Sequence, residues 1–180
     1  MSRLKGKIAI VTGASRRRGI GTAICRTLAN EGADLFFTHF SSYDKNVIHY
    51  DDAEEDWSEQ LSQELRKFGV RAENMELDLS GNDSFSRLLD EVEARMGLPT
   101  ILVNNATYSV DVDFRQLNHD ILDAHYGVNV RGTCMLSVEF ARRLEGKHGG
   151  RIINMVSGQD KAPMAGNIAY VTTKGAISAF

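Results

Sequence analysis

Short apolar runs alternate with longer amphipathic stretches along the whole chain. The run at residues 7–12 (KIAIVT) is uninterrupted and ends at Gly13, which is typical of a buried strand. Residues 20–31 place apolar side chains on one helical face and end before Gly32, which indicates a helix. The same two patterns predict further strands at 33–39, 70–77, 100–103 and 151–156, and further helices at 56–68, 82–96, 117–145 and 169–180.

Strand followed by helix is the pattern of a parallel sheet covered on both faces. Right-handed crossovers then give an α/β fold with a doubly wound, Rossmann-type sheet. The chain contains no internal repeat and no low-complexity linker, so residues 1–180 are expected to form one dinucleotide-binding domain that also carries the catalytic residues.

One connection is unusually long. Residues 40–55 separate the second strand from the next helix, whereas such loops usually have about 2–6 residues. From Asp51 to Glu59 the chain holds six acids and no base. This segment is either a solvated loop leading into an acidic first helical turn or a surface that recognises a partner or substrate.

Composition narrows the function classes. With 42% hydrophobic residues and a net charge of −3 over 180 residues, the chain is typical of a folded globular protein. This charge gives no electrostatic case for nucleic acid, and no apolar run is long enough for a membrane span. The two cysteines, Cys25 and Cys134, argue against a disulfide framework, and after the basic N-terminus no apolar h-region leads to a signal-peptide cleavage site, so we expect a cytoplasmic protein. The histidines show no metal-ligand spacing, so no metal is assigned.

The turn after the first strand is rich in glycine and leads directly into a helix. Glycines allow a close approach of the backbone to a pyrophosphate, and the helix N-terminus attracts its charge. The position of this turn favours a dinucleotide site over a plain turn. The expected cofactor-binding residues of the turn are Gly13, Ser15, Gly19, Ile20 and Gly21.

Three consecutive arginines, Arg16–Arg18, lie inside this turn. Cations oppose the dipole of a helix N-terminus, so stability alone does not explain them, whereas a phosphate-rich ligand does. The alternative is a solvated basic loop. The second strand ends at His39 with no acid before Asp44, and a carboxylate there would repel a 2′-phosphate. Arg16, Arg18 and His39 are therefore assigned to the cofactor, with NADP(H) favoured over NAD(H), although His39 also fits a plain strand-end residue.

Several ordered motifs together resemble the short-chain dehydrogenase/reductase family, and within it the members similar to 3-oxoacyl-(acyl-carrier-protein) reductase. They are the glycine turn, Asp78-Leu79, Asn104-Asn105-Ala106, Asn129, Ser157 and Tyr170-Val171-Thr172-Thr173-Lys174. The chain departs from the family in three ways. Two extra residues separate Gly13 from Gly19, Thr107 replaces a frequent glycine, and family members continue with further strands after the last helix, so the C-terminal part is missing by comparison.

The catalytic chemistry centres on Tyr170 and Lys174, which are four residues apart and share a helix face. An ammonium beside a phenol favours the phenolate, which suits the phenol for proton exchange with a carbonyl or alcohol oxygen. The resemblance implies that Lys174 also binds the nicotinamide ribose, that Ser157 orients the carbonyl, and that Asn129 holds a water linking Lys174 to a proton relay. It also implies adenosine contacts from Asp78, Leu79, Asn105 and Ala106, whereas Asn104 is expected to hold neighbouring strands together.

Each of these residues also has a plainer interpretation. Tyr170 fits a packing residue, Ser157 an ordinary turn, Asn129 a solvent-facing helix residue and Asp78 the N-cap of the following segment. The ordered set favours the catalytic interpretation.

The sequence therefore predicts an NADP-dependent oxidoreductase that acts on a small carbonyl or alcohol, with 3-oxoacyl groups as candidate substrates. The alternative is a truncated, catalytically weak nucleotide-binding relative. A nucleic-acid binder using Arg16–Arg18 is a weaker third option. The fifth strand and the last helix lack their usual cover, so we expect either a homo-oligomer or a longer natural chain.

Overall fold

A computed structural model describes residues 2–158 and 161–180. Five parallel strands form one sheet in the order β3-β2-β1-β4-β5. Their bounds are β1 Ile8–Val11, β2 Asp34–His39, β3 Ala72–Glu76, β4 Ile101–Asn104 and β5 Arg151–Asn154. The predicted doubly wound α/β fold is confirmed, and each predicted strand is present with ends that differ from the prediction by at most two residues.

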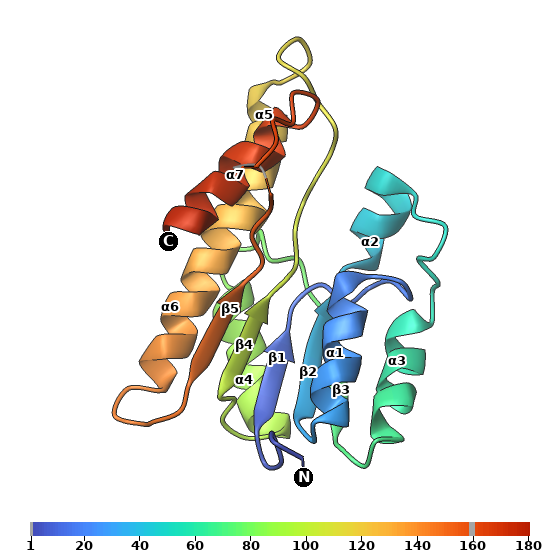
Figure 1. Cartoon of the computed structure of the whole chain (residues 1–180), viewed down its shortest axis with the longest axis vertical. Helices are drawn as coiled ribbons and strands as arrows, with labels where there is room; N and C mark the ends of the chain where they lie inside the picture. Colours follow the sequence, from blue (N-terminus) through green and yellow to red (C-terminus); the bar gives the residue numbers. More distant parts are fainter. Residues whose placement is uncertain (1, 159–160) are drawn as a thin grey trace.

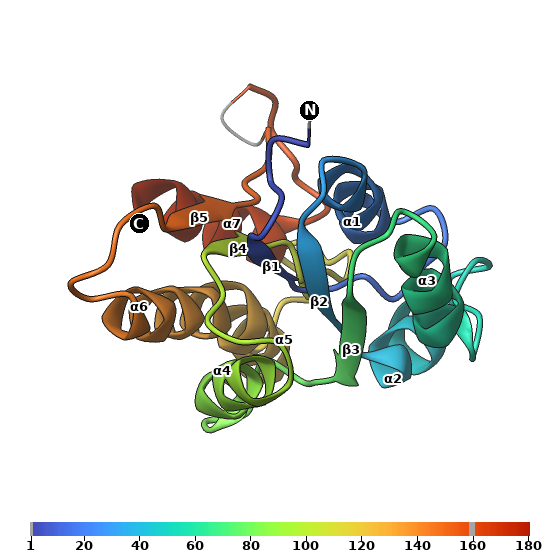
Figure 2. The same ribbon diagram turned by 90° about the horizontal axis from the view of Figure 1, so that it is seen from below.

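The helices cover both faces of this sheet (Figures 1 and 2). In chain order they are α1 Ile20–Asn30, α2 Ser41–Tyr43, η1 Asp44–Ile48, α3 Trp57–Arg66, α4 Ser84–Arg95, α5 His119–Tyr126, η2 Gly127–Gly132, α6 Thr133–Arg143 and α7 Ile168–Ala179. Among the described residues, no helix is long and apolar enough to cross a membrane.

Alternation along the strands builds a core on each face. In β1, Ala9 and Val11 join the apolar cluster under α1 and α3, which includes Trp57, whereas Ile10 joins the cluster under α4 and α6. Successive strand side chains point to opposite faces, so a strand buried on both faces is apolar at nearly every position. The uninterrupted apolar run of β1 has this cause.

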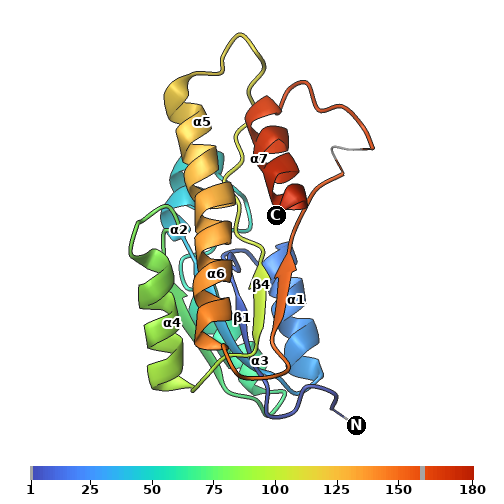
Figure 3. The same ribbon diagram turned by 90° about the vertical axis from the view of Figure 1, so that its left-hand side faces the viewer.

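Two predicted elements differ from the structure. The long connection 40–55 is not all loop, because it contains α2 and a wider π-helical turn, η1. The predicted helix 117–145 is divided into α5, the π-helical segment η2 and α6. Figure 3 shows α5 and α6 as one continuous rod, with α7 beside its upper part. Periodicity alone does not reveal the wider turns, which are frequent at functional sites.

The strand order reverses between β1 and β4, and ligands of open α/β sheets bind at this switch point beyond the carboxyl ends. Asn104 is the last residue of β4 and lies at this edge of the sheet. Its Nδ2 donates to Ser137 Oγ and to Asn154 Oδ1, both at 2.8 Å, which joins β4 to α6 and β5. This bridging role agrees with the sequence interpretation of Asn104.

Candidate active site

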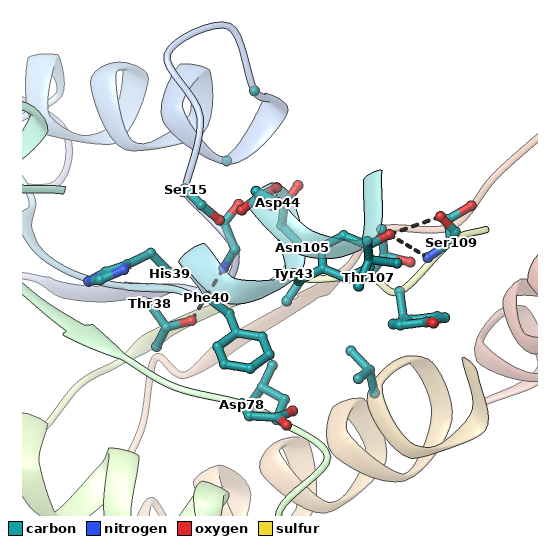
Figure 4. Close-up of a pocket in the computed structure, with 18 of the residues that line it drawn as sticks. Ser15, Thr38, His39, Phe40, Tyr43, Asp44, Asp78, Asn105, Thr107 and Ser109 are labelled. Carbon is teal, nitrogen blue, oxygen red and sulfur yellow. Dashed lines mark hydrogen bonds between the residues drawn. The ribbon is translucent and has the colours of Figure 1, made fainter. Parts of the chain in front are cut away.

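A cavity of about 470 Å³ lies at the carboxyl edge of the sheet (Figure 4). It joins the glycine turn after β1 to the first turns of α7. Most of the residues assigned from the sequence line it, namely Gly13, Ser15, Arg16, Gly19, Ile20, Gly21, His39, Asp78, Leu79, Asn105, Ala106, Tyr170 and Lys174. Arg18, Asn129 and Ser157 are not among the lining residues.

The glycine turn is packed tightly against the end of β4. Gly13 has a φ of +76°, and a Cβ at this position would lie 2.7 Å from the Cα of Ala106. A Cβ on Gly21 would overlap the carbonyl oxygen of Gly13. Asn105 Nδ2 donates to the carbonyl oxygens of Thr12 and Gly13, both at 2.9 Å, and so holds the turn in place. Glycine is required here because the backbone segments touch.

The first turn of α1 faces the cavity. Its N-cap is Gly19, which supplies no side-chain hydrogen bond, and Gly19, Ile20 and Gly21 line the cavity. Uncapped N–H groups at a helix N-terminus bind anions. The geometry therefore fits the pyrophosphate site that the sequence predicts.

Each of the three arginines of the turn forms an ion pair within the protein. Each guanidinium group meets an acid of the long connection, with closest distances of 3.3 Å for Arg16–Asp52, 2.8 Å for Arg17–Glu54 and 2.7 Å for Arg18–Asp51. These ion pairs give the three arginines protein partners that the sequence interpretation did not include. Arg18 is 68% exposed and lies outside the cavity, whereas Arg16 lines it.

The acidic connection is therefore tied to the glycine turn by ion pairs, although Asp51, Glu54 and Glu55 remain exposed to solvent. We call residues 40–55 the strap, because they run from β2 to α3 and form one wall of the cavity. Phe40, Ser42, Tyr43, Asp44, Asn46, Val47 and Tyr50 of the strap line it. The glycine turn, which is two residues longer than the family pattern, carries the three arginines that pair with the strap.

His39 is the last residue of β2 and Asp78 follows β3 by two residues, and both line the cavity. A ring nitrogen of His39 lies 3.2 Å from Asn74 Oδ1, and burial lowers the pKa of His39 below its usual range. Asp78 Oδ1 accepts a hydrogen bond from Ser80 N at 2.8 Å. The Asp78 side chain thus caps the turn that follows it, whereas the N-cap residue of α4 itself is Asp83.

Tyr170 and Lys174 line the cavity from α7. Lys174 is 5% exposed, and its Nζ lies 5.7 Å from the centre of the Tyr170 ring. The ammonium donates to the carbonyl oxygen of Met155 at 2.7 Å, and burial lowers its pKa below the usual range. This single turn of α7 thus places a phenol and a buried cation on one wall.

Asn129 lies behind this wall and is only 1% exposed, so it does not face solvent. Its Oδ1 accepts from Thr107 Oγ1 at 3.0 Å and from Tyr108 N at 2.7 Å. Its Nδ2 donates to the Tyr108 carbonyl at 2.8 Å and to Thr173 Oγ1 at 2.9 Å. Because protein groups engage both ends of the amide, the geometry supports a positioning role next to Lys174.

Ser157 follows β5 and is partly buried, but it does not line the cavity, whose wall there is formed by Met155 and Val156. Its predicted contact with a carbonyl oxygen stays a prediction.

Sequence reasoning missed several residues that shape the site. They are Thr38, whose Oγ1 accepts from Gly13 N, together with Tyr43, Asp44, Thr107 and Thr173. The unusual length of the strap is the one signal that pointed toward Tyr43 and Asp44. Among the described residues, no group of three or more His, Cys, Asp or Glu could hold a metal ion.

Comparisons with known proteins agree with this geometry. A family model described as short chain dehydrogenase matches residues 7–180. An uncharacterized oxidoreductase of Bacillus subtilis, YjdA, is 46% identical over all of this chain and 68% of its own length. The 3-oxoacyl-[acyl-carrier-protein] reductase FabG of Pseudomonas aeruginosa is 30% identical over 98% of this chain and 66% of its own.

A solved structure gives the same picture. A short chain dehydrogenase from Burkholderia cenocepacia in complex with NADP has a TM-score of 0.83 and 32% identity, over 98% of this chain and 66% of its own. The chain thus spans about two thirds of the length of the relatives it matches.

Proposed function

Because the chain belongs to the short-chain dehydrogenase family, whose matched members include named oxidoreductases, we propose that it binds a nicotinamide dinucleotide and carries the residues that transfer a hydride to or from a small carbonyl or alcohol. One observation carries the proposal. A single cavity connects the uncapped N-terminus of α1 to Tyr170 and Lys174. A nicotinamide dinucleotide has a charged pyrophosphate in its middle and the reactive nicotinamide ring at one end, so it matches this arrangement.

The residues present fit such a cofactor. The turn at Gly13 and Gly21 leaves no room for a side chain, and the first turn of α1 offers N–H groups to a pyrophosphate. When bound, the cofactor supplies the hydride chemistry itself.

The chain supplies proton transfer and orientation. In the reductive direction the Tyr170 hydroxyl donates a proton to the carbonyl oxygen as that oxygen gains electrons, and in the oxidative direction it takes the proton back. Lys174, held by the Met155 carbonyl, places a positive charge next to the phenol. Asn129 fixes Thr173, and thereby the turn of α7 that carries both groups.

The substrate class remains broad. Similarity to a 3-oxoacyl-[acyl-carrier-protein] reductase supports 3-oxoacyl groups as candidates. The alternative, a catalytically weak nucleotide-binding relative, stays a prediction from the sequence. A cytoplasmic location and a homo-oligomer stay predictions from the sequence.

The cofactor preference also stays a prediction. NADP in the Burkholderia neighbour supports a nicotinamide dinucleotide in this chain. The predicted preference for NADP(H) rests on Arg16 and Arg18, and both guanidinium groups are paired with acids. These ion pairs argue against a free cationic site for a 2′-phosphate.

Replacing Tyr170 tests the proposed function. Tyr170→Phe removes only the hydroxyl, so cofactor affinity and folding should persist while turnover falls about 100-fold or more, the scale of a lost acid or base. Turnover is followed as the absorbance change of the nicotinamide with a panel of ketones and 3-oxoacyl thioesters. Tyr126→Phe, a change on an exposed face of α5, is the matched control. Near-parental turnover in Tyr170→Phe would assign Tyr170 to packing.

A further inference from the structure

Asp44 is a buried carboxylate of the strap that the proposed chemistry does not use. It is 5% exposed and lines the cavity at the start of η1. Among the described residues, its Oδ2 has no hydrogen-bond partner, although solvent hardly reaches it. Buried polar atoms are almost always paired, so an unpaired carboxylate oxygen at a cavity wall marks the position of a missing donor.

The surroundings of Asp44 identify the part of the ligand that would supply this donor. Figure 4 shows Asp44 next to Ser15 and on the other side of the cavity from Asp78. Tyr170 and Lys174, which line the same cavity from α7, would bind the reactive ring. The glycine turn, which includes Ser15 beside Asp44, would bind the pyrophosphate. Asp44 then faces the sugar of the adenosine half, whose hydroxyl groups are hydrogen-bond donors.

The charges around Asp44 do not suit a phosphate on that sugar. Arg16 Nε lies 3.9 Å from Asp44 Oδ1, but the same guanidinium group lies 3.3 Å from Asp52 and 3.6 Å from the centre of the Tyr50 ring. Arg17 and Arg18 are paired with acids farther along the strap. A 2′-phosphate would therefore meet the Asp44 carboxylate with every nearby arginine already neutralised.

Burial and hydrogen bonding shift the pKa of the Asp44 carboxyl group in opposite directions. Burial raises the pKa of Asp44 above its ordinary value, and the Ser15 hydroxyl and the Arg16 guanidinium counteract the shift. The carboxylate is thus held beside two donors while one of its oxygens stays available.

We infer that Asp44 is the residue that determines cofactor specificity: its free oxygen accepts a hydrogen bond from the 2′-hydroxyl of the adenosine ribose and disfavours a 2′-phosphate, so that the protein binds NAD(H) more tightly than NADP(H). The inference rests on the proposed function. It assigns to the strap a role that the sequence at the end of β2 does not reveal, because four residues lie between His39 and Asp44.

The test compares dissociation constants of NADH and NADPH, measured by fluorescence titration, in the parent and in Asp44→Asn. The parent should bind NADH at least about tenfold more tightly, and Asp44→Asn should shift the ratio toward NADPH by about tenfold or more. Asp44→Ser serves if the asparagine variant does not fold. Asp51→Asn is the matched control, because it removes the same charge from an exposed position 2.7 Å from Arg18, and it should change the ratio less than threefold or so.

ADP-ribose and its 2′-phosphate, used as competitors, repeat the comparison without the nicotinamide ring. A parent that prefers NADPH, or a ratio that Asp44→Asn leaves unchanged, would overturn the inference while the proposed function stands. A parent that binds neither nucleotide would overturn both.

Discussion

Buried polar residues hold this site through hydrogen bonds to more than one element. His125 is 0% exposed and lies behind the loop after β4. One ring nitrogen, Nδ1, lies 2.7 Å from the Ile121 carbonyl, and the other, Nε2, accepts from Val110 N at 3.3 Å. A neutral ring with its proton on Nδ1 satisfies both contacts, whereas a doubly protonated ring cannot accept from Val110.

This arrangement predicts that the free energy of unfolding decreases at acidic pH. Burial lowers the pKa of His125 below its ordinary value of 6.5. The unfolded chain then binds a proton at a pH where the folded chain does not, so the free energy of unfolding falls as the pH drops through 6.5 toward the folded-state pKa. This residue contributes up to ~1.4 kcal/mol per pH unit within that window.

Urea unfolding of the parent and of His125→Gln between pH 7.5 and about 5 measures this contribution. The glutamine variant should show a shallower loss of stability on acidification. His148→Gln, at an exposed position, controls for the removal of an imidazole and should follow the parent curve. Parallel curves for the parent and His125→Gln would remove His125 as a source of acid sensitivity.

At the scale of elements, the strap is fastened on both sides of the cavity. Ion pairs tie it to the glycine turn, and Tyr43 of α2 ties it to the loop after β4. The Tyr43 hydroxyl donates to the Ser109 carbonyl and accepts from Ser109 N, both at 2.9 Å. Burial raises the pKa of Tyr43 to about 12, so its hydroxyl keeps the proton that it donates. Its ring centre lies 5.1 Å from that of Tyr108, whose backbone contacts Asn129.

Tyr43→Phe should loosen this wall without moving the catalytic residues. Two backbone groups of Ser109 would lose their partner, and each net hydrogen bond contributes about 0.5–1.5 kcal/mol, so unfolding should become easier by ~1–3 kcal/mol. Dissociation of the bound nucleotide should be several-fold faster, as seen by stopped-flow fluorescence. An unchanged dissociation rate together with a lowered melting temperature would restrict Tyr43 to a structural role.

At the scale of the whole molecule, β5 is the exposed edge of the sheet. Ile152 and Ile153 are adjacent, so they point to opposite faces, and they are 39% and 47% exposed. Among the described residues β5 pairs only with β4. Helix α7 packs against α5 and η2 instead of covering this strand. An uncovered strand edge with apolar side chains favours association between chains.

The 180-residue chain is therefore expected to self-associate at micromolar concentrations, and Ile153→Lys should shift it toward the monomer. Sedimentation velocity over a concentration series measures both. Phe114→Lys places the same charge on a 72% exposed residue in the loop after β4 and should leave association unchanged. A parent that stays monomeric throughout the series would contradict the edge-strand argument.

Local patterns determined most of the fold. Strand β1 is buried on both faces and is therefore apolar throughout, and α1 ends at a glycine, so each was visible within a few residues of sequence. The five parallel strands follow from such patterns, because strand–helix alternation and right-handed crossovers leave few other topologies. The glycine turn, Tyr170 and Lys174 were identifiable for the same reason, since their chemistry depends on close spacing along one element.

Tertiary structure decided what depends on contacts between distant segments. Sequence order placed Asp44 too far beyond His39 to count as a residue of the site, and only the folding of the strap brought it to the cavity wall. The arginines of the turn resembled a phosphate site until the strap supplied Asp51, Asp52 and Glu54 as their partners. An arginine reads the same in the sequence whether its partner is a ligand or an acid 33 to 37 positions away, because electrostatic pairing depends on distance in space and not on separation along the chain.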